Sequence, residues 1–190
     1  MMQIKRKYQI TEFCHQFIQM HVQSGDICVD ATAGNGNDTE FLCCLKGESG
    51  KVYAFDIQED AIKHTKDRLE AAGHKAELIL DGHEHMKDYV KEVGEVACVV
   101  FNFGYLPGGD HELATKAETS IAAIEAGLEL LRKGGLMSLC IYSGGDSGFD
   151  EKNAILGYLK TLDSKKYLVV VSDYYNRPNN PPMPVQIVKL

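Results

Sequence analysis

The chain of 190 residues lacks several features that mark specialised classes of protein. It has no tryptophan, no Cys-x-x-Cys pair among its six cysteines, and no apolar run longer than the segment from Val96 to Phe101. Because a bilayer span needs about 20 consecutive apolar residues, no membrane segment is expected. Without paired cysteines, and with Cys28, Cys98 and Cys140 inside apolar runs, the sequence favours reduced thiols and a cytoplasmic protein.

Positive charge is also scarce. Twenty Lys and Arg stand against 27 Asp and Glu, so the formal net charge is -7, which argues against a chain that coats nucleic acid through bulk electrostatics. Short basic clusters such as Lys5-Arg6-Lys7 leave local phosphate contacts open. The ordinary composition and the length predict one globular domain over residues 1–190. The oligomeric state stays open, a homodimer included.

Apolar runs alternate with segments of helical period, a pattern typical of a parallel α/β sheet with helices on both faces. Strands are expected at residues 27–30, 52–56, 77–80, 96–101, 136–142, 166–171 and 185–188. No helix separates the last two, which predicts an antiparallel hairpin, and Pro184 fits a strand at the sheet edge. The prediction is a seven-stranded, mostly parallel sheet with an antiparallel C-terminal edge hairpin.

The predicted helices show recognisable starts and stops. Periodic apolar positions indicate helices within residues 13–21, 61–72, 115–133 and 155–162. Gly73 is expected to end the second of them. Thr115 and Glu118 have the spacing of a capping box for the third, and Gly134 should end it.

A Gly-x-Gly turn follows the first predicted strand. Gly34 and Gly36 would let the backbone approach a ligand closely at the point where the strand order of such sheets reverses. Asp56 closes the second strand, where a carboxylate can accept both hydroxyls of an adenosine ribose. These two features fit either a dinucleotide or S-adenosylmethionine.

Two residues at the start of the next helix favour S-adenosylmethionine. Thr39 occupies the place of the third glycine of the dinucleotide fingerprint, and Asp38 puts a carboxylate where a pyrophosphate would bind. That carboxylate repels phosphate but tolerates the zwitterionic methionine moiety, unless it only caps the helix. An NAD-dependent oxidoreductase is the less favoured alternative.

The segment after the third strand contains His83, Glu84 and His85. Histidines two positions apart point to different sides of a helix, and the site offers few ligands, so no metal site is predicted. The position suits contact with an adenine ring instead, and His83 is the preferred residue, with a surface histidine as the alternative.

The fourth strand ends in Asn102, and aromatic residues and a proline follow it up to Asp110. This segment offers an amide acceptor and a flat stacking surface beside a cofactor. The alternative is a Gly/Pro-rich turn whose aromatic side chains fill the core. Asn180-Pro181-Pro182 resembles the tetrapeptide of amino-group DNA methylases but follows the penultimate strand, so we expect it to wall the substrate pocket.

Five segments, at 30–39, 55–58, 82–86, 102–110 and 180–182, resemble the small bacterial methyltransferases of the MnmM type, long labelled rRNA methylases. The resemblance spans nearly the whole chain. It implies a Rossmann-like class I methyltransferase fold with S-adenosyl-L-methionine (SAM) as cofactor. It also implies methylation of the aminomethyl group on the wobble uridine of tRNA, giving 5-methylaminomethyl-2-thiouridine, with the anticodon stem-loop as partner.

The resemblance further implies roles for individual residues. Asn35, Asn37, Asp56, Gln58, Gly82 and His83 would hold the cofactor, while Asn102 and Tyr105 would face the substrate. The cofactor site is expected to include the neighbouring motif residues Asp30, Gly34, Gly36, Asp38, Thr39, Ile57 and Asn102.

The remaining expectations concern the amine and its proton. Phe103, Tyr105 and Tyr142 are expected to desolvate the amine, and Asp110 or Asp146 to accept its proton. The family commonly has a Gly-His pair after the fifth strand, where this chain has Gly144-Gly145, so the proton acceptor stays open. A methyltransferase of a small molecule or rRNA, and a cofactor-binding protein without activity, are the alternatives.

Overall fold

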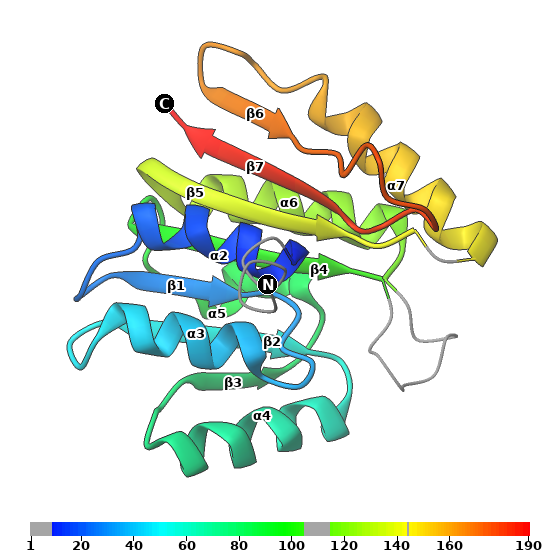
Figure 1. Cartoon of the computed structure of the whole chain (residues 1–190). Coiled ribbons are helices and arrows are strands. Elements are labelled where there is room, and N and C mark those ends of the chain that lie inside the picture. The colour runs from blue at the N-terminus through cyan, green and yellow to red at the C-terminus, as the bar shows by residue number, and fades with distance from the viewer. Residues whose placement is uncertain (1–8, 105–114, 144) are drawn as a thin grey trace.

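The computed structural model describes residues 9–104, 115–143 and 145–190, with residues 145–148 as backbone only. The described residues form a seven-stranded sheet of order β3-β2-β1-β4-β5-β7-β6 (Figure 1). Its strands are β1 (Ile27–Asp30), β2 (Lys51–Asp56), β3 (Glu77–Leu80), β4 (Val96–Phe103), β5 (Leu131–Ile141), β6 (Tyr167–Val171) and β7 (Met183–Lys189). Strands β1 to β5 pair in parallel, and β7 pairs antiparallel with both β5 and β6. The predicted mostly parallel sheet is confirmed.

Helices cover both faces of the sheet (Figure 1). One face carries α2 (Ile10–His21), α3 (Asn37–Lys46) and α4 (Glu59–Ala72); the other carries η1 (His83–His85), α5 (Met86–Tyr89), α6 (Ala117–Leu130) and α7 (Gly145–Leu159). Along β1, Cys28 packs into the first layer and Val29 into the second, because successive side chains of a strand point to opposite faces. Both layers are buried, which explains why the strands read as continuous apolar runs.

The stop of α4 follows its sequence signal, whereas the bounds of α6 do not. Gly73 caps α4 with φ +71°, and the next residue donates its N–H to the Leu69 carbonyl. The predicted capping box of α6 is wrong: Lys116 is the N-cap residue, and the Thr115 hydroxyl accepts a hydrogen bond from Gly104 N instead. The helix also ends earlier than predicted, at Leu130, since the backbone is already extended into β5 there.

The C-terminal hairpin is antiparallel as predicted, but its position in the sheet differs. Strand β7 lies between β5 and β6, so β6 is the edge strand and the edge position expected for Pro184 is wrong. Pro184 is tolerated because it is the second residue of β7, where its carbonyl still accepts a hydrogen bond from Ser172 N at 2.9 Å.

The carboxyl ends of the parallel strands meet at one edge of the sheet, around the switch point between β1 and β4. From β1 the strand order runs outward to β2 and β3 on one side and to β4 and β5 on the other, which leaves a crevice between the loops. Within the described part of the chain, no helix is long and apolar enough to cross a bilayer.

Candidate active site

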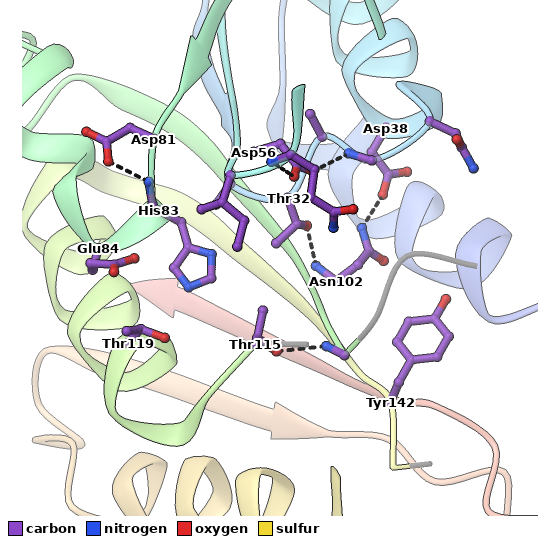
Figure 2. A pocket seen from close by; sticks show the side chains of 18 of the residues that line it. Thr32, Asp38, Asp56, Asp81, His83, Glu84, Asn102, Thr115, Thr119 and Tyr142 are labelled. Carbon is purple, nitrogen blue, oxygen red and sulfur yellow. Dashed lines mark hydrogen bonds between the residues drawn. The ribbon is translucent and has the colours of Figure 1, made fainter. Parts of the chain in front are cut away.

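A cavity of about 380 Å³ opens at the carboxyl ends of these strands (Figure 2). It lies where the strand order reverses, the usual ligand position in an open α/β sheet. The described residues that line it are Thr11, Ala31, Thr32, Ala33, Gly34, Asn35, Asn37, Asp38, Asp56, Ile57, Gln58, Asp81, Gly82, His83, Glu84, Asn102, Gly104, Thr115, Lys116, Thr119 and Tyr142.

The turn after β1 forms one wall of the cavity. Gly34 N donates to Asp56 Oδ2 at 2.9 Å, and Gln58 N donates to Asp56 Oδ1 at 3.0 Å, so one carboxylate joins the turns after β1 and β2. Gly36 has φ +76°, and a Cβ there would lie 2.9 Å from Thr65 Cα on α4. Glycine is therefore required for both conformation and space.

Behind this turn lies the fully buried carboxylate of Asp30. It accepts hydrogen bonds from Thr39 Oγ1 at 2.6 Å and from Thr32 N at 3.2 Å. Burial, reinforced by the nearby charge of Asp38, raises the pKa of Asp30 to about 7. Asp38 and Asp56 line the cavity in front of it, and their carboxylates suit a cationic group.

Asn102, near the end of β4, faces the cavity from the opposite side (Figure 2). Its backbone N–H donates to Thr32 Oγ1 at 2.7 Å, and its Nδ2 donates to Asp38 Oδ2 at 2.7 Å. A carboxylate only accepts hydrogen bonds, so this contact fixes which side of the amide is nitrogen. None of the described residues donates a hydrogen bond to Asn102 Oδ1, so this oxygen can accept one from a ligand.

The two histidines after β3 have different environments. His83 is only 9% exposed, and its ring lies edge-on to Phe101 and Phe103. Burial lowers its pKa, and its buried Nε2 has no partner among the described residues. His85 is exposed and bonds Asp81 through Nδ1 at 2.9 Å. The two side chains therefore have different surroundings, and among the described residues no cluster of three or more His, Cys, Asp or Glu side chains could hold a metal ion.

The wall around β4 and β5 is closed by Gly104, Thr115 and Tyr142 (Figure 2). Gly104 N donates to Thr115 Oγ1 at 2.9 Å, and Thr115 N donates back to the Gly104 carbonyl at 3.1 Å. Gly104 has φ +139°, and a Cβ there would lie 2.9 Å from Tyr142 Cβ. Burial raises the pKa of the Tyr142 phenol, which therefore stays protonated at neutral pH.

Most of the site residues predicted from the sequence meet in this cavity. Those that line it are Gly34, Asn35, Asn37, Asp38, Asp56, Ile57, Gln58, Gly82, His83, Asn102 and Tyr142. Asp30, Gly36 and Thr39 lie behind the lining residues and support them. Tyr105 and Asp110 lie outside the described residues, as does the side chain of Asp146.

Two expectations about the walls differ from the structure. Phe103 is fully buried in the core, where its ring stacks on Phe101 and lies edge-on to His83, so it does not line the cavity. The segment Asn180-Pro181-Pro182 is not among the lining residues either.

Several lining residues were not predicted from the sequence. They are Thr11, Ala31, Thr32, Ala33, Asp81, Glu84, Gly104, Thr115, Lys116 and Thr119. Thr32, Glu84 and Gly104 lie inside motifs identified in the sequence, so the residues next to them in those motifs were the available signal. Thr115 and Thr119 come from the start of α6, and nothing in the local pattern places them at the cavity.

Comparison with known proteins agrees with this geometry. The family model described as "Putative rRNA methylase" matches residues 52–188. A chloroplastic tRNA (mnm(5)s(2)U34)-methyltransferase of Arabidopsis thaliana is 37% identical in an alignment of 183 positions that covers 90% of this chain and 66% of the relative's length. This chain thus spans slightly less than two thirds of that protein.

Two solved structures share nearly the whole fold. The protein from Clostridium thermocellum described as a "putative rRNA-methylase" is 46% identical, with a TM-score of 0.92 over 95% of this chain and 97% of that chain. A "putative methyltransferase" from Streptococcus mutans, in complex with SAH, is 39% identical, with a TM-score of 0.87 over 96% of this chain and 98% of that chain. The class I methyltransferase fold and the resemblance inferred from the sequence are confirmed. With a family model that matches most of its residues, the chain belongs to the family described as "Putative rRNA methylase".

Proposed function

We propose that this protein is a SAM-dependent tRNA methyltransferase. Its substrate atom would be the aminomethyl nitrogen of 5-aminomethyl-2-thiouridine, or of its 2-oxo form, at the wobble position. The observation that carries the proposal is one cavity that has Gly34 and Asp56 on one wall and Asn102 on the other. No described residue donates a hydrogen bond to the amide oxygen of Asn102. The name of the Arabidopsis relative, which specifies U34 of tRNA, supports the substrate.

The described residues fit an adenosyl cofactor. The Asp56 oxygens keep lone pairs for two ribose hydroxyls, and the unpartnered His83 Nε2 offers a hydrogen bond to adenine. The carboxylates of Asp38 and Asp56 in the cavity lining suit a sulfonium and an ammonium group. SAH in the Streptococcus mutans relative supports the same choice. The residues proposed to hold the cofactor are Gly34, Asn35, Asn37, Asp56, Ile57, Gln58, Gly82 and His83.

Bound in this way, SAM would supply a methyl carbon on a positively charged sulfur. A nitrogen lone pair can attack that carbon and displace the sulfur. The task of the chain is then to present a neutral amine at about 3 to 3.5 Å in line with the carbon–sulfur bond. Asn102 Oδ1 would accept one amine N–H, which directs the lone pair away from the amide and toward the methyl group. The half-buried ring of Tyr142 would help to close this end of the cavity to water.

The amine must lose a proton before it can attack. An alkylamine with a pKa of about 10 is roughly one thousandth neutral at pH 7, which costs about 4 kcal/mol unless the site lowers that pKa. Removal of water by the cavity walls lowers the pKa of an amine, as it does for buried lysines. Asp110 and Asp146 are the proposed proton acceptors, with Tyr105 as a second substrate contact.

The proposal is tested by a methyl-transfer assay. Purified protein would be incubated with labelled SAM and tRNA from cells lacking this protein, and the nucleosides analysed by mass spectrometry. We expect 5-aminomethyl-2-thiouridine to be converted to its methylamino form in the anticodon loop. Because the family description names rRNA, ribosomal RNA serves as the competing substrate. Methylation of rRNA alone, or of neither RNA, would contradict the proposal.

We also propose that the protein acts in the cytoplasm as one domain of residues 1–190. All six cysteines are free, five of them buried, which supports a reducing environment. The reduced state of the cysteines is tested by unfolding the protein, alkylating its thiols and measuring its mass. Six alkylated cysteines are expected, and a pair protected as a disulfide would contradict the reducing environment.

A further inference from the structure

We propose that His15, on the N-terminal helix α2, is a positioning residue of the reaction. It would hold Asp38 in the one orientation in which Asp38 fixes the Asn102 carboxamide with its oxygen toward the substrate amine. The identity of the amine rests on the proposed function. The linkage from His15 through Asp38 to Asn102 rests only on contacts between described residues.

His15 is fixed at two points on α3. Its Nε2 lies 2.6 Å from Asp38 Oδ1, and its ring stacks on Phe41 with a centroid separation of 3.7 Å and an interplanar angle of 6°. Asp38 and Phe41 are three residues apart on α3 and so share one face of that helix. The stack on Phe41 therefore sets the plane of the imidazole in which Nε2–H points to Asp38.

This contact is shielded from water. The side chains of His15 and Asp38 are 16% and 12% exposed, respectively. A hydrogen bond between a ring N–H and a carboxylate is stronger in such an environment than at an exposed surface. His15 can thus hold the carboxylate in place rather than merely lie beside it.

Asp38 transmits this orientation to Asn102. With Oδ1 bonded to His15, the other oxygen of Asp38 accepts Asn102 Nδ2–H at 2.7 Å. Rotating the amide by half a turn would bring Asn102 Oδ1 against a carboxylate oxygen, where neither atom can donate. The amide is therefore held with its nitrogen toward Asp38, and its oxygen accepts no hydrogen bond from any residue that the structure describes.

The orientation matters because a neutral amine uses its lone pair to attack and has only N–H groups left for the protein. An amide oxygen accepts such an N–H, whereas an amide NH₂ would compete for the lone pair. Without His15, Asp38 Oδ1 would also be free to pair with the ammonium form of the substrate, which cannot react. His15 therefore favours the productive arrangement in two ways.

The test compares two substitutions at one position. His15→Phe keeps an aromatic ring on Phe41 but removes the donor, while His15→Gln keeps a donor near the place of Nε2. Since a misplacement of about 1 Å costs on the order of 100-fold in rate, we expect His15→Phe to lower kcat about 10- to 100-fold. His15→Gln should restore most of the rate, and the Kd for SAM should change less than about threefold in both, a small effect on the affinity scale.

A second readout needs neither substrate nor cofactor. The side-chain NH₂ of Asn102 gives a pair of NMR signals, identified by their loss in Asn102→Ser. We expect slow hydrogen exchange for these signals in wild type and His15→Gln, and fast exchange in His15→Phe. If His15→Phe does not fold, Phe41→Leu, which removes the stack but keeps the donor, should show the same changes to a smaller degree.

The outcomes separate this inference from the proposed function. Unchanged turnover and unchanged exchange in His15→Phe, or a loss of SAM affinity as large as the loss of turnover, would overturn the role of His15. If the wild-type protein methylates no tRNA, the proposed function fails, while the exchange rates still decide whether His15 orients Asn102.

Discussion

The two walls of the cavity are constructed differently. The wall between β1 and β2 is formed by tight turns whose backbone N–H groups are held by one carboxylate, Asp56. The wall at the end of β4 depends on side chains from distant parts of the chain: Asn102 bonds Thr32 and Asp38, 70 and 64 residues away in sequence. The first wall presents backbone groups of fixed geometry, and the second presents one amide whose orientation other side chains select. We therefore expect substitutions to separate cofactor binding from turnover.

The largest effect is expected for Asn102→Ala. Losing the amide acceptor should lower kcat about 100- to 1000-fold, the range found when one oriented hydrogen-bonding group is removed from an active site. The Kd for SAM should change less than about threefold, because Asp56 and its turn are untouched. Single-turnover kinetics and calorimetry measure the two quantities. Equal losses in both would show that Asn102 serves the cofactor instead.

The converse result is expected for Asp56→Ala. The ribose hydroxyls lose their proposed acceptor, and Gly34 N and Gln58 N lose theirs. Since a hydrogen bond to a charged group contributes about 1.5–3 kcal/mol, SAM affinity should fall about 10- to 100-fold. At saturating SAM, kcat should stay within about threefold of wild type, since Asn102 is unaffected. Asp56→Asn, which keeps one acceptor oxygen, should lie in between. A normal affinity in Asp56→Ala would mean that this wall does not bind the cofactor.

The tight turn itself is tested by Gly36→Ala, with Gly134→Ala as its matched control. Both glycines have a positive φ, +76° and +72°, but only at Gly36 would a Cβ meet backbone, at 2.9 Å. The control should lose about 1–2 kcal/mol of unfolding free energy from the left-handed conformation alone. Gly36→Ala should lose roughly 1–3 kcal/mol more from overpacking against α4. Urea unfolding gives both values, and equal losses would contradict the required close approach.

The last prediction is a difference in pH dependence. The pKa of Asp30 is raised to about 7 in the folded protein, so between its ordinary value and pH 7 the folded state holds a proton that the unfolded state has lost. The unfolding free energy should therefore fall as pH rises through this window. Asp30→Asn removes this titration. Urea unfolding from pH 5 to 8 should show wild type losing stability relative to the variant, and parallel profiles would refute the raised pKa.

The same contrast explains which parts could be predicted from the sequence. The bounds of β1 and β3 and the positions of Gly34 and Asp56 at the ends of the first two strands follow from local signals: apolar runs, glycines and a carboxylate at fixed spacing. The capping box at Thr115 failed because one hydroxyl can bond either its own helix or another segment, and here Gly104 is the partner.

Long-range choices were not predictable for a related reason. Antiparallel pairing of β6 and β7 could be inferred, but whether β7 or β6 packs next to β5 depends on the whole sheet. The same holds for His15: no local pattern shows that it contacts Asp38 and Phe41, because α2 is placed against α3 only by the fold.

A crystal structure of the protein soaked with S-adenosylhomocysteine would test the central claim most directly. The account predicts ribose hydroxyls within hydrogen-bonding distance of Asp56, adenine beside His83, and the sulfur directed toward Asn102. Ligand bound outside the cavity, or inside it with the sulfur turned away from Asn102, would contradict the account.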